Sequence, residues 1–204
     1  MGWYSARILP RLLDIGCGQR TTADLRSRIC AGLSGDVLEI GFGSGHNIAH
    51  YPAAVRRVTA VEPSDVAWHL ANHRLAETVI HVERGALDAQ TLPFADGTFD
   101  TCLSTWTLCS IPDVMAALRD VRRVVKPGGT FHFLEHGLAP DESVRRWQGR
   151  LEPLQQRLFG GCHLTREMGD LVATAGFEMI ELDTFYMHGS PRFEGATYLG
   201  VARA

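Results

Sequence analysis

The stretch Val37-Leu38-Glu39-Ile40-Gly41-Phe42-Gly43-Ser44-Gly45 decides the fold, because it places three glycines at alternate positions directly after an apolar strand. Glycine allows positive φ angles and carries no side chain, so a ligand can lie against the backbone of such a turn. The arrangement is typical of nucleotide-type cofactor sites. A dinucleotide fingerprint G-x-G-x-x-G would need glycine where the sequence has His46. The match to a nicotinamide or flavin site is therefore imperfect.

An upstream segment, Leu12-Leu13-Asp14-Ile15-Gly16-Cys17-Gly18, resembles a second turn of this kind, with Glu39 at a suitable distance downstream. However, Gln19-Arg20 follow where a third small residue belongs. Accepting this segment would also shift every later element by one unit. We therefore interpret it as a decoy.

Short β-branched runs alternate with stretches of helical period after residue 35, as expected when crossover helices join parallel strands. The predicted strands are Asp36–Gly41, Arg57–Glu62, Val79–Glu83, Phe99–Thr105 and Gly129–Glu135, and the clearest helix is Asp113–Val125. Phe177–Tyr186 and Ala196–Arg203 are interpreted as an antiparallel strand pair at one sheet edge. The pattern predicts five βα units in one Rossmann-like, doubly wound α/β sheet.

Two further helices are expected between the last parallel strand and the strand pair. Glu142–Phe159 has helical character, with a break or kink at Pro153. The next helix is expected to start at Thr165 and end at Gly176. We predict a single domain over residues 1–204, with a helical lid (1–35, its better helix Ala23–Leu33), a cofactor-binding core (36–136), a helical acceptor-side segment (137–176) and the strand pair (177–204).

The composition, 45% hydrophobic and 21% charged over 204 residues, is that of one ordinary globular domain. A formal charge of −3 gives no attraction toward nucleic acid or anionic membrane. Apolar runs are too interrupted for a transmembrane segment or a signal peptide. The five cysteines are widely spaced, without a C-x-x-C pair, which favours reduced thiols. We expect a cytoplasmic protein without a nucleic-acid partner, and the oligomeric state stays open.

Acidic residues follow two of the predicted strands. Glu62 lies 21 residues after Gly41, where a carboxylate can accept hydrogen bonds from both hydroxyls of a ribose. Asp88 follows the third strand and is placed to accept from an exocyclic amine such as that of adenine, although a lone loop Asp is usually turn chemistry. Together with the glycine turn, these acids predict an adenosine site.

These segments together resemble the class I S-adenosylmethionine-dependent methyltransferases. The resemblance rests on Glu39–Gly45, Glu62, Asp88–Phe94, Phe99-Asp100 and Arg123–Gly129. It implies a seven-stranded sheet whose last strand inserts antiparallel, and S-adenosylmethionine as cofactor. The cofactor-binding residues that it implies are Glu39, Gly41, Phe42, Gly43, Ser44, Gly45, Glu62, Pro63, Asp88, Ala89 and Thr105.

A narrower resemblance is to the thiol S-methyltransferases of the methyltransferase-like seven group and their bacterial relatives. It rests on Asn47-Ile48, Tyr51-Pro52, Thr107–Ile111, Glu135-His136, Trp147, Glu152-Pro153 and Gly161–Glu167. The last run lies outside the cofactor residues and is the best evidence for the subfamily. It implies a thiol as the methyl acceptor.

Candidates on the acceptor side each have a structural alternative. His136, after the fifth strand, is the candidate catalytic residue, because it can orient or deprotonate an acceptor; a histidine bonded to Glu135 or to backbone is about as common. For Cys109 we favour a buried apolar role, and for Cys162-His163 a structural or acceptor-loop role. Trp106 and Trp147 wall the acceptor pocket or belong to the core.

No metal site is predicted. His46 and His50 are four residues apart on an expected helix, a spacing that can hold a metal, but no third ligand is apparent.

The favoured function is methyl transfer to a small-molecule thiol. The alternatives are an oxygen, nitrogen or carbon acceptor, a catalytically silent S-adenosylmethionine-binding module, and a nicotinamide-dependent oxidoreductase, which His46 disfavours.

Overall fold

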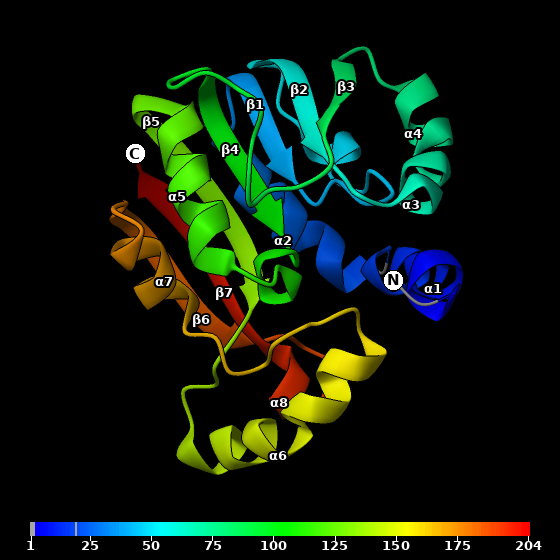
Figure 1. The fold of residues 1–204 in the computed structure, drawn as a ribbon, viewed down its shortest axis with the longest axis vertical. Coiled ribbons are helices and arrows are strands. Elements are labelled where there is room, and N and C mark those ends of the chain that lie inside the picture. The colour runs from blue at the N-terminus through cyan, green and yellow to red at the C-terminus, as the bar shows by residue number, and fades with distance from the viewer. Residues whose placement is uncertain (1–2, 19) are drawn as a thin grey trace.

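Seven strands form one mixed sheet in the computed structural model, which describes residues 3–18 and 20–204 (Figure 1). Their order is β3-β2-β1-β4-β5-β7-β6. The strands are β1 (Gly35–Ile40), β2 (Val55–Val61), β3 (His81–Ala86), β4 (Phe99–Thr105), β5 (Val125–His136), β6 (Glu178–Tyr186) and β7 (Ala196–Arg203). The first five pair in parallel, and β7 is antiparallel to both β5 and β6. The predicted sheet and its inserted last strand are confirmed.

The order of the strands sets where a ligand can bind. β1 lies at the centre, with β2 and β3 on one side and β4 and β5 on the other. The connections therefore run in opposite directions from β1, which leaves a crevice outside the carboxyl ends of β1 and β4. The glycine turn begins at the end of β1 and thus lies at this switch point.

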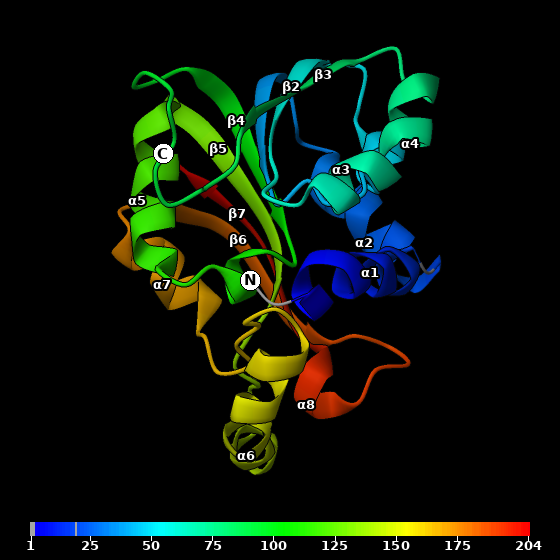
Figure 2. The same cartoon turned by 45° about the vertical axis from the view of Figure 1, so that its right-hand side comes forward.

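Helices cover both faces of the sheet. They are α1 (Leu9–Cys17), α2 (Arg20–Cys30), α3 (Asp65–Leu70), α4 (Asn72–Glu77), α5 (Val114–Val124), α6 (Glu142–Leu158), α7 (Met168–Thr174) and α8 (Arg192–Gly195), and a π-helical turn (Tyr4–Ile8) precedes α1. The helices α5 and α7 pack on one face, around Phe131 and Phe133, and α2 packs on the other face against Leu103 and Leu134. Figure 2 shows α1 and α6 beyond the edge toward which β1 and β4 point.

The predicted alternation of strands and helices fails at two connections. Within the described residues, β1 and β2 are joined by a short 3-10 helix, Ile48–His50, and β3 and β4 by a loop without an α-helix. Pro52 prevents a longer helix in the first connection, and Pro93 and Gly97 disfavour a helix in the second. His46 and His50 therefore do not lie on one helix face. His46 contacts Asp14 and His50 contacts Ser27.

The expected break at Pro153 is wrong, because α6 runs as one helix from Glu142 to Leu158 with the proline inside it. A side-chain hydrogen bond spans the turn around the proline, because Gln156 Nε2 donates to Glu152 Oε1 over 3.1 Å. Thr165 does not start α7. Glu167 caps that helix instead, accepting from Asp170 N at 2.9 Å, while Thr165 donates to Glu152. Gly176, with φ of 97°, ends the α7 region as predicted.

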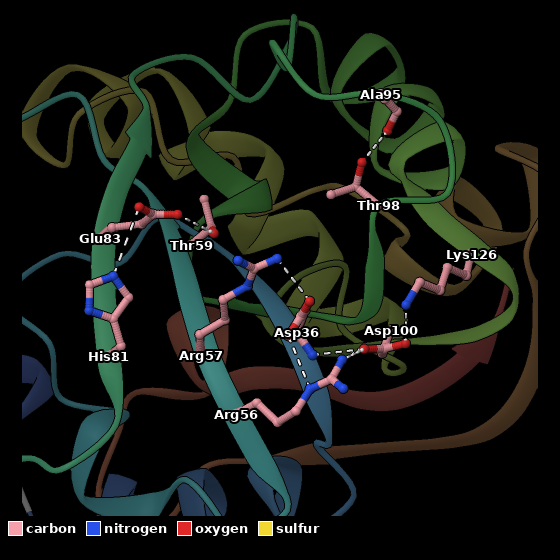
Figure 3. A network of polar contacts seen from close by, with 10 residues as sticks. All are labelled: Asp36, Arg56, Arg57, Thr59, His81, Glu83, Ala95, Thr98, Asp100 and Lys126. Atoms are coloured by element: carbon pink, nitrogen blue, oxygen red, sulfur yellow. Dashed lines mark hydrogen bonds and ion pairs between the residues drawn. The ribbon is translucent and has the colours of Figure 1, made fainter.

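The amino-terminal edge of the parallel strands carries a network of ion pairs on the opposite side from the glycine turn (Figure 3). Asp100 at the start of β4 accepts from Asp36 N, and it pairs with Arg56 at 3.0 Å and Lys126 at 2.5 Å. Hydrogen bonds from Asp36 N and the Lys126 ammonium hold the pKa of Asp100 below its usual value. Ion pairs and hydrogen bonds therefore link the amino-terminal ends of these strands.

No helix in ranges 3–18 and 20–204 combines the length and apolar character needed to cross a membrane. The cytoplasmic location stays a prediction.

The apolar face of α5 predicts a clear stability test. Leu118 is fully buried against the sheet, so Leu118→Ala should lower the free energy of unfolding by about 2–5 kcal/mol through lost transfer energy and a cavity. Leu154 on α6 is 55% exposed, and Leu154→Ala should stay within about 0.5 kcal/mol of the parent. Urea denaturation of both variants measures the difference. Equal losses would contradict the assigned packing of α5.

Candidate functional site

The glycine turn at the end of β1 packs so closely against a neighbouring side chain that only glycine fits at its first position. Gly41, Gly43 and Gly45 have φ of 69°, 59° and 79°, in the left-handed region. A Cβ atom on Gly41 would lie 1.9 Å from Thr107 Oγ1, so the turn is packed directly against the loop that follows β4. A Cβ atom on Gly43 would meet only Gly41 O, at 3.9 Å. The backbone at Gly43 is therefore open to a ligand.

Glu62, at the end of β2, is tied to this turn. Its Oε2 accepts from Gly43 N and its Oε1 from Ser64 N, both at 2.7 Å. Burial raises the pKa of Glu62, while the hydrogen bonds from the two N–H groups oppose that rise. Pro63, between these contacts, is exposed. The carboxylate thus connects the ends of β1 and β2, and its remaining lone pairs can accept from a ligand.

Other predicted cofactor residues occupy different environments. Asp88 is exposed after β3, and its Oδ1 accepts from Gln90 N at 2.9 Å and Gln90 Nε2 at 3.0 Å, which is the turn chemistry of an Asx motif. Ala89 is buried in the core. Phe42 packs on Trp68 with ring centroids 5.2 Å apart, and Ser44 O accepts from Arg74. Phe42 and Ala89 thus fill the core around the site.

A buried polar cluster lies directly behind the turn, around Glu39 and Thr105. Asn47 Nδ2 donates to Glu39 Oε1 at 2.8 Å and to Thr105 Oγ1 at 3.0 Å. Tyr51 OH donates to Glu39 Oε2, and Arg26 on α2 donates to Asn47 Oδ1 at 2.5 Å. Since Glu39 is fully buried, these donors supply the hydrogen bonds that water would otherwise give.

Burial raises the pKa of Glu39 to about 7, although hydrogen bonds from Tyr51 and Asn47 and the charge of Arg26 act in the opposite direction. The sequence predicted a role for Glu39 and Thr105 but not for Arg26, Asn47 or Tyr51. Asn47 and Tyr51 belong to segments that carry the narrower family resemblance, but the sequence predicted no role for either side chain. Arg26 reaches the cluster from α2, and no local sequence pattern predicts that contact.

Trp106, directly after β4, lies between this cluster and the acceptor side. It has φ of 50°, which is unusual for a large side chain. The Arg26 guanidinium lies 4.8 Å from the centre of its ring on one side, and the His136 ring centroid is 6.1 Å away. Trp106 is half-buried. Trp147, in contrast, is 57% exposed on α6 and belongs to neither core nor site.

His136, Cys109 and Cys162 meet in space, which the sequence analysis did not predict. Their ligand atoms all lie within 4.8 Å of one another. Cys109 comes from the turn after β4, His136 ends β5, and Cys162 follows α6. Both thiols are buried, and His136 Nε2 is a buried nitrogen without a hydrogen-bond partner in the described part of the chain.

The two cysteines differ in their proton affinity. A hydrogen bond from the Cys109 thiol lowers the pKa of Cys162, and the imidazole of His136 acts in the same direction against the effect of burial. That hydrogen bond and burial raise the pKa of Cys109. Both cysteines are buried, as the apolar role predicted for Cys109 requires, but neither that role nor the structural or acceptor-loop role predicted for Cys162-His163 includes the proximity to His136. His163, the sequence neighbour of Cys162, faces Glu152 instead, with Nδ1 at 2.8 Å from Oε1.

The helices that precede β1, α1 and α2, lie beside the glycine turn and the buried polar cluster. The decoy segment is helical, since Leu12–Cys17 lies within α1. Its Asp14 pairs with His46, next to the glycine turn, at 2.9 Å. Tyr4 OH donates to Leu158 O of α6 at 3.1 Å. An open cavity of about 640 Å³ lies between α2 and α4 and shares Arg26 and Tyr51 with the polar cluster. Its lining does not include Glu62, Asp88 or His136, so we place the candidate site at the strand ends and not in this cavity.

The switch-point sheet and the open glycine turn define an α/β protein of the nucleotide-cofactor-binding class. A family model described as a methyltransferase domain matches residues 38–133. Thiol S-methyltransferase TMT1A of Homo sapiens is 36% identical over 158 residues, which cover 74% of this chain and 64% of that protein. The chain thus spans less than two thirds of the length of this relative.

Solved structures agree with this assignment at the level of the fold. An S-adenosylmethionine-dependent methyltransferase from Thermotoga maritima has a TM-score of 0.66 and 22% identity, with 95% of this chain and 93% of that chain covered. A geranyl diphosphate methyltransferase in complex with S-adenosylmethionine has a TM-score of 0.68 and 14% identity, with 89% and 83% covered. These matches support a class I S-adenosylmethionine-dependent methyltransferase with S-adenosylmethionine as its cofactor.

The buried Glu39 predicts a pH-dependent stability. The folded protein binds the Glu39 proton more tightly than the unfolded chain does, because its pKa is about 7 against an ordinary 4.5. The stability that this tighter proton binding contributes is fully present below the ordinary pKa of Glu39, and it is lost as the pH rises through about 7. Relative to the parent, Glu39→Gln should therefore gain stability between pH 5 and pH 8, by more than about 1 kcal/mol.

Urea denaturation at several pH values, without cofactor, measures this gain. Glu83→Gln is the control, because Glu83 is an exposed glutamate on the neighbouring strand β3. A constant difference between Glu39→Gln and the parent across this range would contradict the raised pKa.

Proposed function

We propose that this chain transfers the methyl group of S-adenosylmethionine to a small-molecule thiol. The observation that carries the cofactor half is the open backbone at Gly43, hydrogen-bonded over 2.7 Å to the buried carboxylate of Glu62. The thiol half is supported by the 36% identity to a protein named thiol S-methyltransferase. It is further supported by a buried, sulfur-rich environment around His136.

The residues at the strand ends fit the cofactor. The position of a Cβ on Gly43 is free of protein atoms out to 3.9 Å, so an adenosine moiety can lie against the turn. Glu62 would hold the ribose hydroxyls, and Asp88 would accept from the adenine amine through the oxygen that is not used by Gln90 N. The wall around the adenosine moiety would be formed by Gly41, Gly45, Pro63 and Thr105. When bound, the cofactor supplies an activated methyl group on a sulfonium sulfur.

On the acceptor side, the chain provides orientation and a dry pocket. The thiolate sulfur forms a bond to the methyl carbon while the bond between that carbon and the sulfonium sulfur breaks. The products are the methyl thioether of the acceptor and neutral S-adenosylhomocysteine. Opposite charges disappear in this step, so a site of low polarity favours the transition state over the separated ions. His136 lies on the acceptor side and orients the acceptor. The α1 segment, held to the turn through Asp14 and His46, would act as the lid that excludes water.

Titration calorimetry with S-adenosylhomocysteine, followed by a methyl-transfer assay with small alkyl thiols, tests the proposal. Micromolar binding, about −8 kcal/mol, together with thiol turnover is the expected result. Binding without turnover on thiols would overturn the acceptor and direct the search to oxygen, nitrogen or carbon nucleophiles. Absence of binding would overturn the cofactor site.

Glu62→Ala should weaken S-adenosylhomocysteine binding at least tenfold, because it removes charged hydrogen bonds to the ribose and releases the Gly43 amide. Calorimetry measures the affinity, and circular dichroism checks that the sheet is intact. Glu83→Ala, on the exposed surface of β3, should bind like the parent. Parent-like affinity in Glu62→Ala would refute the placement of the ribose.

His136→Ala should lower the turnover number at least tenfold while leaving S-adenosylhomocysteine affinity unchanged, because His136 lies on the acceptor side of Trp106. Steady-state kinetics with an alkyl thiol, combined with calorimetry, separates the two effects. His163→Ala, which alters a histidine bound to Glu152, is the comparison variant. An unaltered turnover number in His136→Ala would show that His136 has a structural role.

A further inference from the structure

The cluster of Cys109, His136 and Cys162 is the only group of three or more potential metal ligands found together in the described residues. It joins three segments that are far apart in the chain: the turn after β4, the end of β5 and the loop after α6. We propose that these three side chains bind one divalent zinc ion, and that the fourth position of the ion takes the thiol acceptor. The acceptor role rests on the proposed function, whereas the ion site does not.

The donor set is chemically that of zinc. Two thiolates and one imidazole form the Cys₂His set found in open zinc sites, which keep a fourth position for water or substrate. Two thiolates also neutralise the double positive charge of the ion, which favours binding in a buried place. Harder cations such as Mg²⁺ and Ca²⁺ prefer oxygen ligands, and the cluster offers none of its own.

The geometry needs only a small contraction. Zinc–sulfur bonds of about 2.3 Å and zinc–nitrogen bonds of about 2.0 Å place tetrahedral ligands roughly 3.5–3.8 Å apart. The three ligand atoms lie within 4.8 Å of one another, so rotations that move them by about an ångström complete the site.

Burial supplies an independent reason for a ligand here. Cys109 and Cys162 are 2% and 5% exposed, and His136 Nε2 is buried with no hydrogen-bond partner in the part of the chain that the structure describes. An unpaired buried nitrogen costs free energy unless a ligand satisfies it. Glu135, whose Oε1 accepts from Ser104 and Thr107, lies next to His136 in sequence and has a second buried oxygen, Oε2, that is likewise unpaired.

The position of the cluster explains why the ion would serve the acceptor. Thr107, two residues before Cys109, packs against Gly41 of the glycine turn, and Trp106 lies next to His136. The cluster is therefore at the same strand-end edge as the proposed cofactor site. A thiol that binds the ion loses its proton to solvent and becomes a thiolate. Its sulfur then forms the bond to the methyl carbon as the carbon–sulfonium bond breaks.

Cobalt(II) is the probe, because it replaces zinc and reports thiolate ligands through sulfur-to-cobalt charge-transfer absorption. The full chain, reduced and treated with a chelator, is titrated anaerobically with Co²⁺ and then with Zn²⁺. We expect one equivalent of cobalt, intense charge-transfer bands, the visible bands of a tetrahedral ion, and loss of all bands when zinc is added. Absence of thiolate bands from the reduced protein would overturn the site.

Variants assign the ligands. Cys109→Ser and Cys162→Ser should each weaken cobalt binding at least tenfold and reduce the charge-transfer intensity. His136→Asn should weaken binding while keeping the thiolate bands. Cys102→Ala is the matched control, because Cys102 is also fully buried but lies on β4 outside the cluster. Parent-like bands in Cys109→Ser or Cys162→Ser would overturn the assignment, and calorimetry with S-adenosylhomocysteine verifies that each variant is folded.

The acceptor role has its own readout. Adding a small alkyl thiol to the cobalt protein should shift the visible bands and add charge-transfer intensity, whereas the corresponding alcohol should not. Cobalt binding without any response to thiol would keep the ion site and overturn its role in acceptor binding. This result is distinguishable from failure of the proposed function, which appears as absence of S-adenosylhomocysteine binding or of methyl transfer in the zinc-loaded protein.

Discussion

The contact between Gly41 and Thr107 is the constraint on which the rest of the site depends. A Cβ atom on Gly41 would stand 1.9 Å from Thr107 Oγ1, so the ends of β1 and β4 meet with backbone against side chain. This approach turns the chain so that Gly43 faces open space. It also holds the loop that continues to Cys109. One close contact between strand ends therefore positions both the cofactor side and the acceptor side.

Three buried glutamates lie at the same edge, and each is stabilised in a different way. Glu39 accepts from side chains, Glu62 from backbone N–H groups, and Glu135, through Oε1 alone, from Ser104 and the Thr107 N–H. In each case burial raises the pKa of the carboxyl group, and the hydrogen bonds oppose the rise. The opposite edge of the sheet uses exposed ion pairs instead. The difference follows from solvent: surface charges need no internal partner, whereas buried ones do.

The helices outside the sheet complete the site from sequence segments that carry no motif. Asp14 of α1 pairs with His46, and Arg26 of α2 reaches both Asn47 and Thr105. The segment after α6 brings Cys162 to Cys109 and His136. The proposed cofactor site on the parallel strands is thereby joined to a proposed acceptor side that includes residues from the surrounding helices.

The sequence by itself determined the parallel strands, the helix over Val114–Val124 and the glycine turn, because apolar periodicity and glycine placement act locally. The insertion of the last strand followed only from the resemblance to a known family. The sequence did not predict the missing helix after the turn, the unbroken helix through Pro153, or the start of α7 at Glu167. Pro52 interrupts the connection after the glycine turn, and Thr165 donates to Glu152 instead of capping α7. Only the tertiary structure decided that Arg26 joins Glu39 and that Cys109 meets Cys162. Residues that far apart in the chain become neighbours through the packing of whole elements, and no local pattern records that packing.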